Sequence, residues 1–141
     1  MEKYIEIAKS EAYKAYKKDE VPIGAVIFNE KGVVFKGHNN KHKKNNIIGH
    51  AEINCLKNAS KMKRSWILDD YSILVTLEPC LFCLLALEES RIKKIYYLNR
   101  NNKSGGLDEY KKIRNELEII KLDTDYEYEK MLKNFFKNKR N

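Results

Sequence analysis

Two cysteines separated by two residues, Cys80 and Cys83, constrain this chain more than any other feature. The apolar, partly β-branched segment 72–77 predicts a buried strand, and residues 81–90 predict a helix. The cysteines therefore lie where a strand passes into a helix, with Pro79 in the first helical turn, where its missing N–H costs nothing. At spacing i, i+3 the two sulfurs share one face. Free N–H groups and the dipole at the start of the helix favour the thiolate form that binds metal.

An upstream His-Ala-Glu segment supplies a third metal ligand and a carboxylate. His50 and Glu52 are two residues apart, which on a regular helix places their side chains about 200° from each other. They point into one pocket only if His50 precedes the helix predicted over 51–62, where the backbone is still extended. One histidine and two cysteines leave the fourth position of a tetrahedral zinc for water, whose pKa falls to about 7. Glu52 would take that proton and deliver it to a substrate, so the sequence predicts a catalytic zinc site.

Each motif taken alone has a simpler interpretation. A single Cys-x-x-Cys also occurs in thiol redox proteins and as half of a structural zinc site, and His and Glu at a helix start are ordinary capping residues. The combination in this order favours catalytic zinc, and the chain has no second Cys-x-x-Cys to complete a four-cysteine site. Cys55 is interpreted as a core residue and Glu78 as an acid at the start of the 81–90 helix. His38 and His42 are interpreted as loop or solvent-exposed histidines.

The periodicity of the whole sequence predicts an α/β fold. With 141 residues, 43% of them hydrophobic, the chain is expected to form one domain, residues 1–141, with a genuine core. The first two strands form a hairpin, a helix between the last two strands makes those two parallel, and helices cover both faces of the five-stranded sheet. The predicted strands are 21–28, 33–37, 72–77, 92–98 and 117–121, and the predicted helices are 5–16, 51–62, 81–90, 107–114 and 125–137.

The charge balance favours an anionic partner. The formal net charge is +8 and the sequence pI is about 9.3, which is typical of proteins that bind polyanions. A solvated lysine-rich face is the commoner explanation of such a positive charge. The charge therefore supports a polyanionic partner only together with other features. No apolar run approaches eighteen residues and the N-terminus lacks the apolar core of a signal peptide, so we expect a cytoplasmic protein without a membrane span.

Beyond the zinc motif, the sequence resembles the bacterial tRNA-specific adenosine deaminases of the cytidine deaminase-like superfamily. The zinc motif identifies the superfamily. The tRNA branch is indicated by the strand at 21–26, the loop at 103–105 and the aromatic and basic end of the last helix, 132–140. The other matching segments are Gly37-His38-Asn39, His50-Ala51-Glu52, Val75-Thr76-Leu77-Glu78-Pro79-Cys80-Leu81-Phe82-Cys83 and Ser90-Arg91-Ile92.

This resemblance implies a three-layer α/β/α cytidine deaminase-like fold and a zinc-dependent hydrolase. The implied reaction converts the wobble adenosine, position 34 of a tRNA anticodon, to inosine and releases ammonia. One Zn²⁺ per chain would be held by His50, Cys80 and Cys83, with Glu52 as the catalytic residue. The implied partners are the tRNA anticodon stem-loop and a second copy of the chain in a homodimer. The substrate-binding residues carried over by the resemblance are Asn39, Ala51, Lys103, Phe135, Phe136 and Arg140.

The chain departs from the family pattern at two places. Leu84-Leu85-Ala86-Leu87 replaces small residues that usually follow the second cysteine, which changes the packing beside the zinc helix and the family's homodimer contact. Asn101 replaces a usual aspartate in a loop near the nucleic acid, and we expect a weaker preference for RNA over DNA. The alternative function is deamination of a free base, nucleoside or nucleotide, which needs neither the basic tail nor the basic loop 39–46. A non-catalytic RNA-binding subunit is disfavoured because Glu52 is present.

Overall fold

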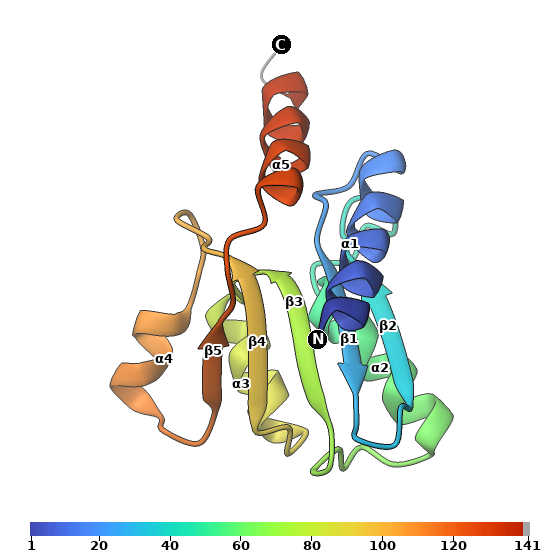
Figure 1. The fold of residues 1–141 in the computed structure, drawn as a ribbon, viewed down its shortest axis with the longest axis vertical. Coiled ribbons are helices and arrows are strands. Elements are labelled where there is room, and N and C mark those ends of the chain that lie inside the picture. The colour runs from blue at the N-terminus through green and yellow to red at the C-terminus, as the bar shows by residue number, and fades with distance from the viewer. Residues whose placement is uncertain (140–141) are drawn as a thin grey trace.

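The computed structural model describes residues 1–139, which form a five-stranded mixed sheet with five helices (Figure 1). The strands are β1 (Gly24–Phe28), β2 (Val34–His38), β3 (Ser72–Leu77), β4 (Lys94–Asn99) and β5 (Glu118–Lys121). The helices are α1 (Glu2–Lys17), α2 (Ala51–Lys63), α3 (Leu81–Glu89), α4 (Leu107–Ile113) and α5 (Tyr126–Lys139). The strand order is β2-β1-β3-β4-β5. β1 is antiparallel to both neighbours, whereas β3, β4 and β5 are parallel to one another, so the predicted mixed sheet is confirmed.

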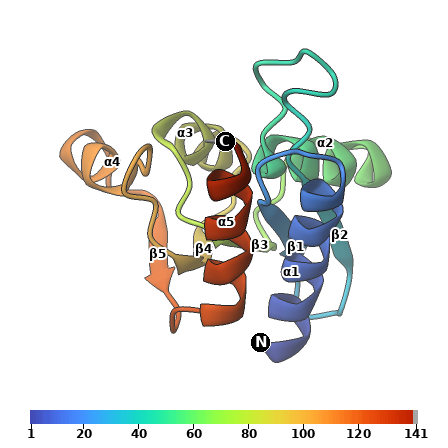
Figure 2. The same ribbon diagram turned by 90° about the horizontal axis from the view of Figure 1, so that it is seen from above.

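Helices cover both faces of this sheet, which confirms the predicted three-layer arrangement. Figure 2 shows α1 and α5 on one side of the sheet and α2, α3 and α4 on the other. The largest core cluster contains Cys55 of α2, Leu84 of α3 and Ile73 of β3. Smaller clusters pack Ala8 of α1 against the other face, and Tyr128 of α5 joins one of them. The apolar face of each helix therefore accounts for its place in the fold.

Two predicted strand starts are wrong by two or three residues, each for a local reason. β1 begins at Gly24 and not at residue 21, because Pro22 has no N–H and the N–H of Ile23 turns back to the carbonyl of Val21 at 2.8 Å. β4 begins two residues later than expected, after the left-handed Arg91 (φ 72°). α3 begins at Leu81 as predicted, but its N-cap is Cys80, so the expectation that Pro79 lies in the first turn is wrong.

α5 stands at the end of the sheet where β3 and β4 finish (Figure 1). Its first turn is held to α1 by Lys9, whose Nζ lies 3.0 Å from Asp125 Oδ2. The Asn99 side chain, at the end of β4, also donates to the carbonyl of Asp125 at 3.2 Å. Parallel strands of an open sheet present their carboxyl ends to the crevice where ligands bind. The helix is thus anchored over the part of the fold that is expected to carry the site.

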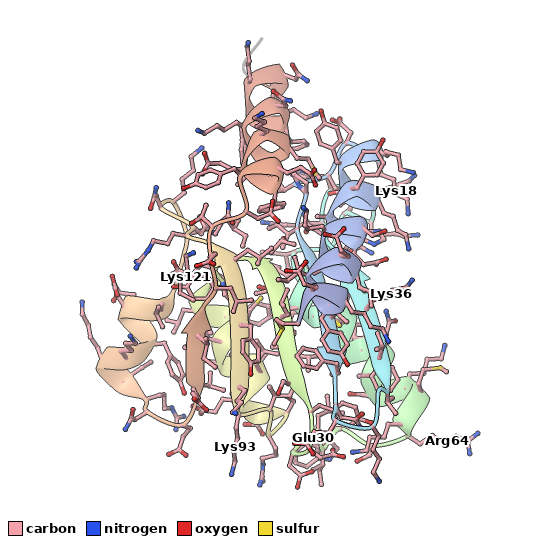
Figure 3. The ribbon with its side chains drawn as sticks, in the orientation of Figure 1. Lys18, Glu30, Lys36, Arg64, Lys93 and Lys121 are labelled. Carbon is pink, nitrogen blue, oxygen red and sulfur yellow. The ribbon has the colours of Figure 1, made fainter. Side chains whose placement is uncertain are left out.

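Charged side chains are distributed over several surfaces of the molecule. Figure 3 places Glu30 and Lys93 at one end of the sheet and Lys18 towards the other, beside α1. The net charge of +8 therefore does not by itself define a binding surface. None of the helices in residues 1–139 combines the length and the apolar content needed to cross a bilayer.

Candidate active site

Three potential metal ligands converge at the starts of two helices. His50 is the N-cap of α2 and has extended backbone angles (φ −79°, ψ 148°), while Cys80 is the N-cap of α3 and Cys83 lies in its first turn. His50 Nδ1 lies 3.8 Å from Cys80 Sγ and 3.5 Å from Cys83 Sγ. All three ligand atoms lie within 4.8 Å of one another. A tetrahedral zinc with bonds of about 2.0–2.3 Å holds such atoms about 3.6 Å apart, so these residues fit the metal.

The protonation behaviour of this cluster also suits a cation. A hydrogen bond from Cys83 lowers the pKa of the Cys80 thiol to about 4, aided by His50 and opposed by burial. The hydrogen bond to Cys80 is the main cause that raises the pKa of His50. The hydrogen bond between the two thiols and the burial of Cys83 raise the pKa of the Cys83 thiol. A ready thiolate at the start of a helix, with a second sulfur and an imidazole beside it, is a zinc ligand set.

Glu52 lies beside these ligands and is 4% exposed. It occupies the first turn of α2, and it lines the same cleft as His50. On a regular helix, residues at i and i+2 point in different directions. Because the backbone at His50 is extended, His50 and Glu52 can nevertheless face one pocket, as expected from the sequence. Burial raises the pKa of Glu52 to about 7, and the negative charge of Cys80 adds to this effect. A carboxyl group that titrates near neutral pH can both accept and return a proton.

His50, Cys80 and Glu52 line a cleft of about 820 Å³, whereas Cys83 is buried behind it. Its walls come from segments far apart in the sequence: the loop after β2, the starts of α2 and α3, the loop after β4, and α5. In Figure 1 these segments lie towards the end of the sheet where β3 and β4 finish. Five positive side chains contribute to the lining, and they are Lys41, Arg100, Lys103, Lys133 and Lys137. The cleft is therefore large enough for a nucleobase with flanking groups and carries charge suited to phosphates.

Asn39, Lys103 and Phe136 line this cleft, as the sequence analysis expected of substrate-binding residues. Asn39 is 5% exposed, and its side-chain amide donates to the carbonyl of Val21 at 3.3 Å. Lys103 Nζ lies 4.7 Å from the centre of the Phe136 ring, a cation–π contact that joins the loop after β4 to α5. The amide of Asn39, the ammonium group of Lys103 and the ring of Phe136 thus line the same cleft as the metal cluster.

Among the described residues, Ala51 and Phe135 do not line the cleft. Ala51 is fully buried, although its N–H belongs to the unpaired first turn of α2. Phe135 is 6% exposed and packs edge to face on Phe136, with ring centres 5.3 Å apart. Arg140 lies outside the described residues.

Glu78 organises the loop after β4, a role that the sequence analysis missed. It was expected to be an acid at the start of α3, but its carboxylate accepts hydrogen bonds from the N–H groups of Asn101 at 3.5 Å and Leu107 at 3.2 Å. A Cβ atom at Gly105 would lie 2.3 Å from Glu78 Oε2, and one at Gly106 would lie 2.1 Å from the nitrogen of Leu81. The adjacent glycines were the available signal, because paired glycines often mark a close backbone approach.

Three other predictions concern residues outside the metal cluster, Cys55, His42 and His38. Cys55 is fully buried and its S–H donates to the carbonyl of Phe35 at 3.3 Å, which confirms it as a core residue. His42 is exposed, as expected. His38 is not a loop histidine, because it is the last residue of β2 and its Nδ1 lies 3.0 Å from Glu11 Oε1. A partner 27 residues away on α1 left no local signal in the sequence.

Related proteins match most of this chain. Residues 1–99 match the family described as the cytidine and deoxycytidylate deaminase zinc-binding region. A tRNA-specific adenosine deaminase of Rickettsia felis is 41% identical over 107 residues, which cover 74% of this chain and 74% of the relative. A tRNA-specific adenosine deaminase of Aquifex aeolicus is 33% identical over 145 residues, which cover 99% and 96% of the two chains.

Solved structures agree with this relationship. A structure from a study of A-to-I editing by tRNA:A34 deaminases at the wobble position has a TM-score of 0.79 and 30% identity, and it covers 85% of this chain and 97% of its own. A guanine deaminase from Bacillus subtilis, at 23% identity and a TM-score of 0.68 over 97% and 93% of the chains, supports the fold alone. The zinc-binding region and the His-Cys-Cys cluster together identify zinc as the cofactor. The chain belongs to the zinc-dependent cytidine and deoxycytidylate deaminase family.

Proposed function

We propose that this protein hydrolyses adenosine to inosine at the wobble position of a tRNA anticodon. The observation that carries the proposal is the convergence of His50, Cys80, Cys83 and Glu52 at one cleft with basic and aromatic lining. The relatives named tRNA-specific adenosine deaminase, at 33% and 41% identity, support the choice of substrate. An anticodon loop presents unstacked bases that a deaminase can draw into its pocket.

His50, Cys80 and Cys83 hold the zinc in this proposal, and the bound metal supplies a Lewis acid that lowers the pKa of water. Glu52 accepts a proton at its carboxylate and returns it to the leaving amino group, because burial keeps its pKa at about 7. One water molecule is consumed: its oxygen becomes the 6-oxo group of inosine, and the amino nitrogen leaves as ammonia.

We assign the recognition of the base and its flanking nucleotides to three residues of the cleft lining. Asn39 lies on the wall next to Val21 and is assigned the hydrogen bond to the base. Phe136 offers a ring on which an unpaired base can stack, and Lys103 beside it offers charge to a phosphate. Ala51 is assigned to substrate binding through its backbone N–H. Phe135 is assigned the role of supporting the Phe136 ring, on which it packs edge to face.

The proposal includes a homodimer. Leu84 and Leu87 are fully buried, so these bulky side chains fill the core and leave the surface of α3 free. Phe82, which is 48% exposed, presents its ring edge to His50 at 5.7 Å between centres, and Ile47 is 79% exposed. A second copy that covered such apolar side chains would bury surface that now contacts water. Since the proposed substrate is tRNA, we also place the enzyme in the cytoplasm.

The test is the deamination of tRNA by the purified, zinc-loaded protein. Total tRNA, adenosine, cytidine and guanine are incubated separately, inosine is located by sequencing, and ammonia is measured. We expect inosine confined to the wobble position. The Glu52→Gln variant should lose at least about a hundredfold in rate at unchanged zinc content. Glu89→Gln is the matched control, because the same change at an exposed glutamate of α3 should leave the rate unaltered.

Each alternative function has its own outcome in this experiment. Ammonia from a free base or nucleoside, with tRNA unchanged, would overturn the proposed substrate but keep the zinc chemistry. Full activity of Glu52→Gln would contradict its catalytic role. No deamination of any substrate by the zinc-loaded protein would favour a non-catalytic RNA-binding subunit.

A further inference from the structure

A buried carboxylate just after α1 holds the loop that connects β2 to α2. Glu20 is 1% exposed. Its Oε1 accepts a hydrogen bond from the N–H of His42 at 3.0 Å, and its Oε2 accepts one from the N–H of Lys43 at 2.5 Å. Both oxygens of one carboxylate are therefore engaged by two adjacent amides of the loop. Since a buried carboxylate is stable only when it is hydrogen-bonded, this contact favours the loop conformation in which both amides face Glu20.

The backbone before Glu20 is shaped for this contact. Asp19 has a positive φ of 62°, and the N–H of Glu20 returns to the carbonyl of Ala15 at 3.0 Å, which closes the end of α1. The two adjacent acids end in different environments. The side chain of Asp19 remains 74% exposed and pairs with Lys139, whereas Glu20 is buried. Removal of the charge of Asp19 can therefore serve as a control for removal of the charge of Glu20.

The loop that Glu20 holds carries positive charge to the cleft. Lys41 and His42 contribute to the cleft lining, and Lys43 and Lys44 are exposed on the same loop. Figure 2 shows this loop, between β2 and α2, reaching outward past the start of α2. Within the loop the N–H of Asn46 donates to the carbonyl of Lys41 at 2.9 Å, so residues 41–46 form one closed turn. The position of that turn decides where its lysines stand.

We infer that Glu20 is a positioning residue for RNA binding: it holds the amides of His42 and Lys43, and so keeps Lys41 at the cleft and the other lysines of the loop beside it. This inference rests on the proposed function for its ligand, an RNA stem-loop. Charge alone predicts the opposite effect, because removal of an acid beside an RNA-binding cleft should tighten the binding of a polyanion. The sign of the effect therefore separates positioning from simple electrostatics.

The first experiment compares Glu20→Gln with Asp19→Asn in the zinc-loaded protein, with an anticodon stem-loop RNA as substrate. Both changes remove one negative charge, but glutamine turns an NH₂ group towards an amide N–H of the loop. For Glu20→Gln we expect KM to rise roughly tenfold while kcat stays within about twofold. The salt dependence of binding should also weaken by about one phosphate contact. Asp19→Asn should leave KM within about twofold, because its exposed ion pair contributes little.

The second experiment asks whether Glu20 acts through the lysines of the loop. Lys41→Ala and Lys43→Ala are introduced together, with and without Glu20→Gln. If the inference is correct, Glu20→Gln raises KM little further once both lysines are gone, because the two changes remove the same contacts. Additive effects, or a lower KM for Glu20→Gln alone, would overturn it.

A third measurement needs neither substrate nor a folded variant. Amide hydrogen exchange in the wild-type protein should show His42 and Lys43 protected at least about tenfold more than Lys41, an exposed residue of the same loop. Absence of that protection would overturn the inference whatever the activity. Failure of the wild-type protein to convert the stem-loop RNA would instead overturn the proposed function, so the two failures are distinguishable.

Discussion

Tyr128 anchors α5 to the segment that leads into β1, and its hydroxyl group can be removed by a single substitution. The side chain is fully buried, and its O–H donates to the carbonyl of Pro22 at 2.7 Å across 106 residues of sequence. Pro22 lies between Val21 and Ile23, both of which line the cleft. Tyr128→Phe keeps the packed ring but leaves the carbonyl of Pro22 without its partner.

The expected effect on stability follows from that missing hydrogen bond. A buried polar group left unpaired costs about 1–3 kcal/mol. A chain of 141 residues unfolds with an entropy of about 0.3 kcal/mol per kelvin, so the Tm should fall by about 3–10 °C. Because α5 supplies Leu132 and Phe136 to the cleft, we also expect a higher KM for stem-loop RNA, with zinc content unchanged.

Thermal unfolding followed by calorimetry measures the first effect, and steady-state deamination measures the second. Tyr126→Phe is the matched control: Tyr126 is the first residue of α5 and is 71% exposed, so loss of its hydroxyl should change neither value. A Tm of Tyr128→Phe within about 1 °C of the wild type would refute the reasoning, because it would mean that the Pro22 carbonyl does not depend on this bond.

Three further predictions follow from single side chains. Cys80→Ala should lose bound zinc, measured by elemental analysis, whereas Cys55→Ala should keep it, because Cys55 lies in the core and not in the metal cluster. Asn101→Asp should raise the ratio of deamination rates on RNA and single-stranded DNA, and an equal ratio in both proteins would contradict the expected role of this position. Burial opposes ionisation of Glu11, yet hydrogen bonds from His38 and Lys14 lower its pKa from the usual 4.5 to about 2. Since the folded pKa is the lower one, this stabilisation, at most about 3 kcal/mol, is present above pH 4.5 and lost as the pH falls towards 2. Urea unfolding of Glu11→Gln should therefore differ most from the wild type at pH 7 and converge with it near pH 2.

Local sequence patterns predicted the elements that depend on neighbouring residues. β3 has the predicted bounds, because a mainly apolar, partly β-branched segment from Ser72 to Leu77 suits a strand buried on both faces. The start of β1 could not be read in the same way, because the apolar pattern continues through Pro22 although that residue has no N–H for the sheet. The metal ligands were predictable because each follows from local geometry: a residue before a helix, and two cysteines at the start of another.

The contacts of Glu20 and Glu78 with the loop amides were not predictable from local patterns. Glu20 reads as an ordinary acid after a helix, and Glu78 as an acid before one, yet each carboxylate binds backbone amides 22 to 29 residues away. Phe135 and Phe136 are equivalent in the sequence, but only Phe136 contributes to the cleft lining while Phe135 packs inward. Small differences in helix rotation decide which of two adjacent aromatic rings faces the ligand.

By itself the sequence determined the His-Cys-Cys cluster that suits zinc, the place of Glu52 beside it and the α/β class, because these depend on residue type, short spacing and hydrophobic period. Only the tertiary structure decided the cleft: α5, the loop after β2 and the loop after β4 come together because parallel strands end at one edge of the sheet. Contacts such as Tyr128 with Pro22 and Glu20 with His42 then hold those segments in place. Their partners are distant in the chain, so the free energy that selects them arises only when the core has formed.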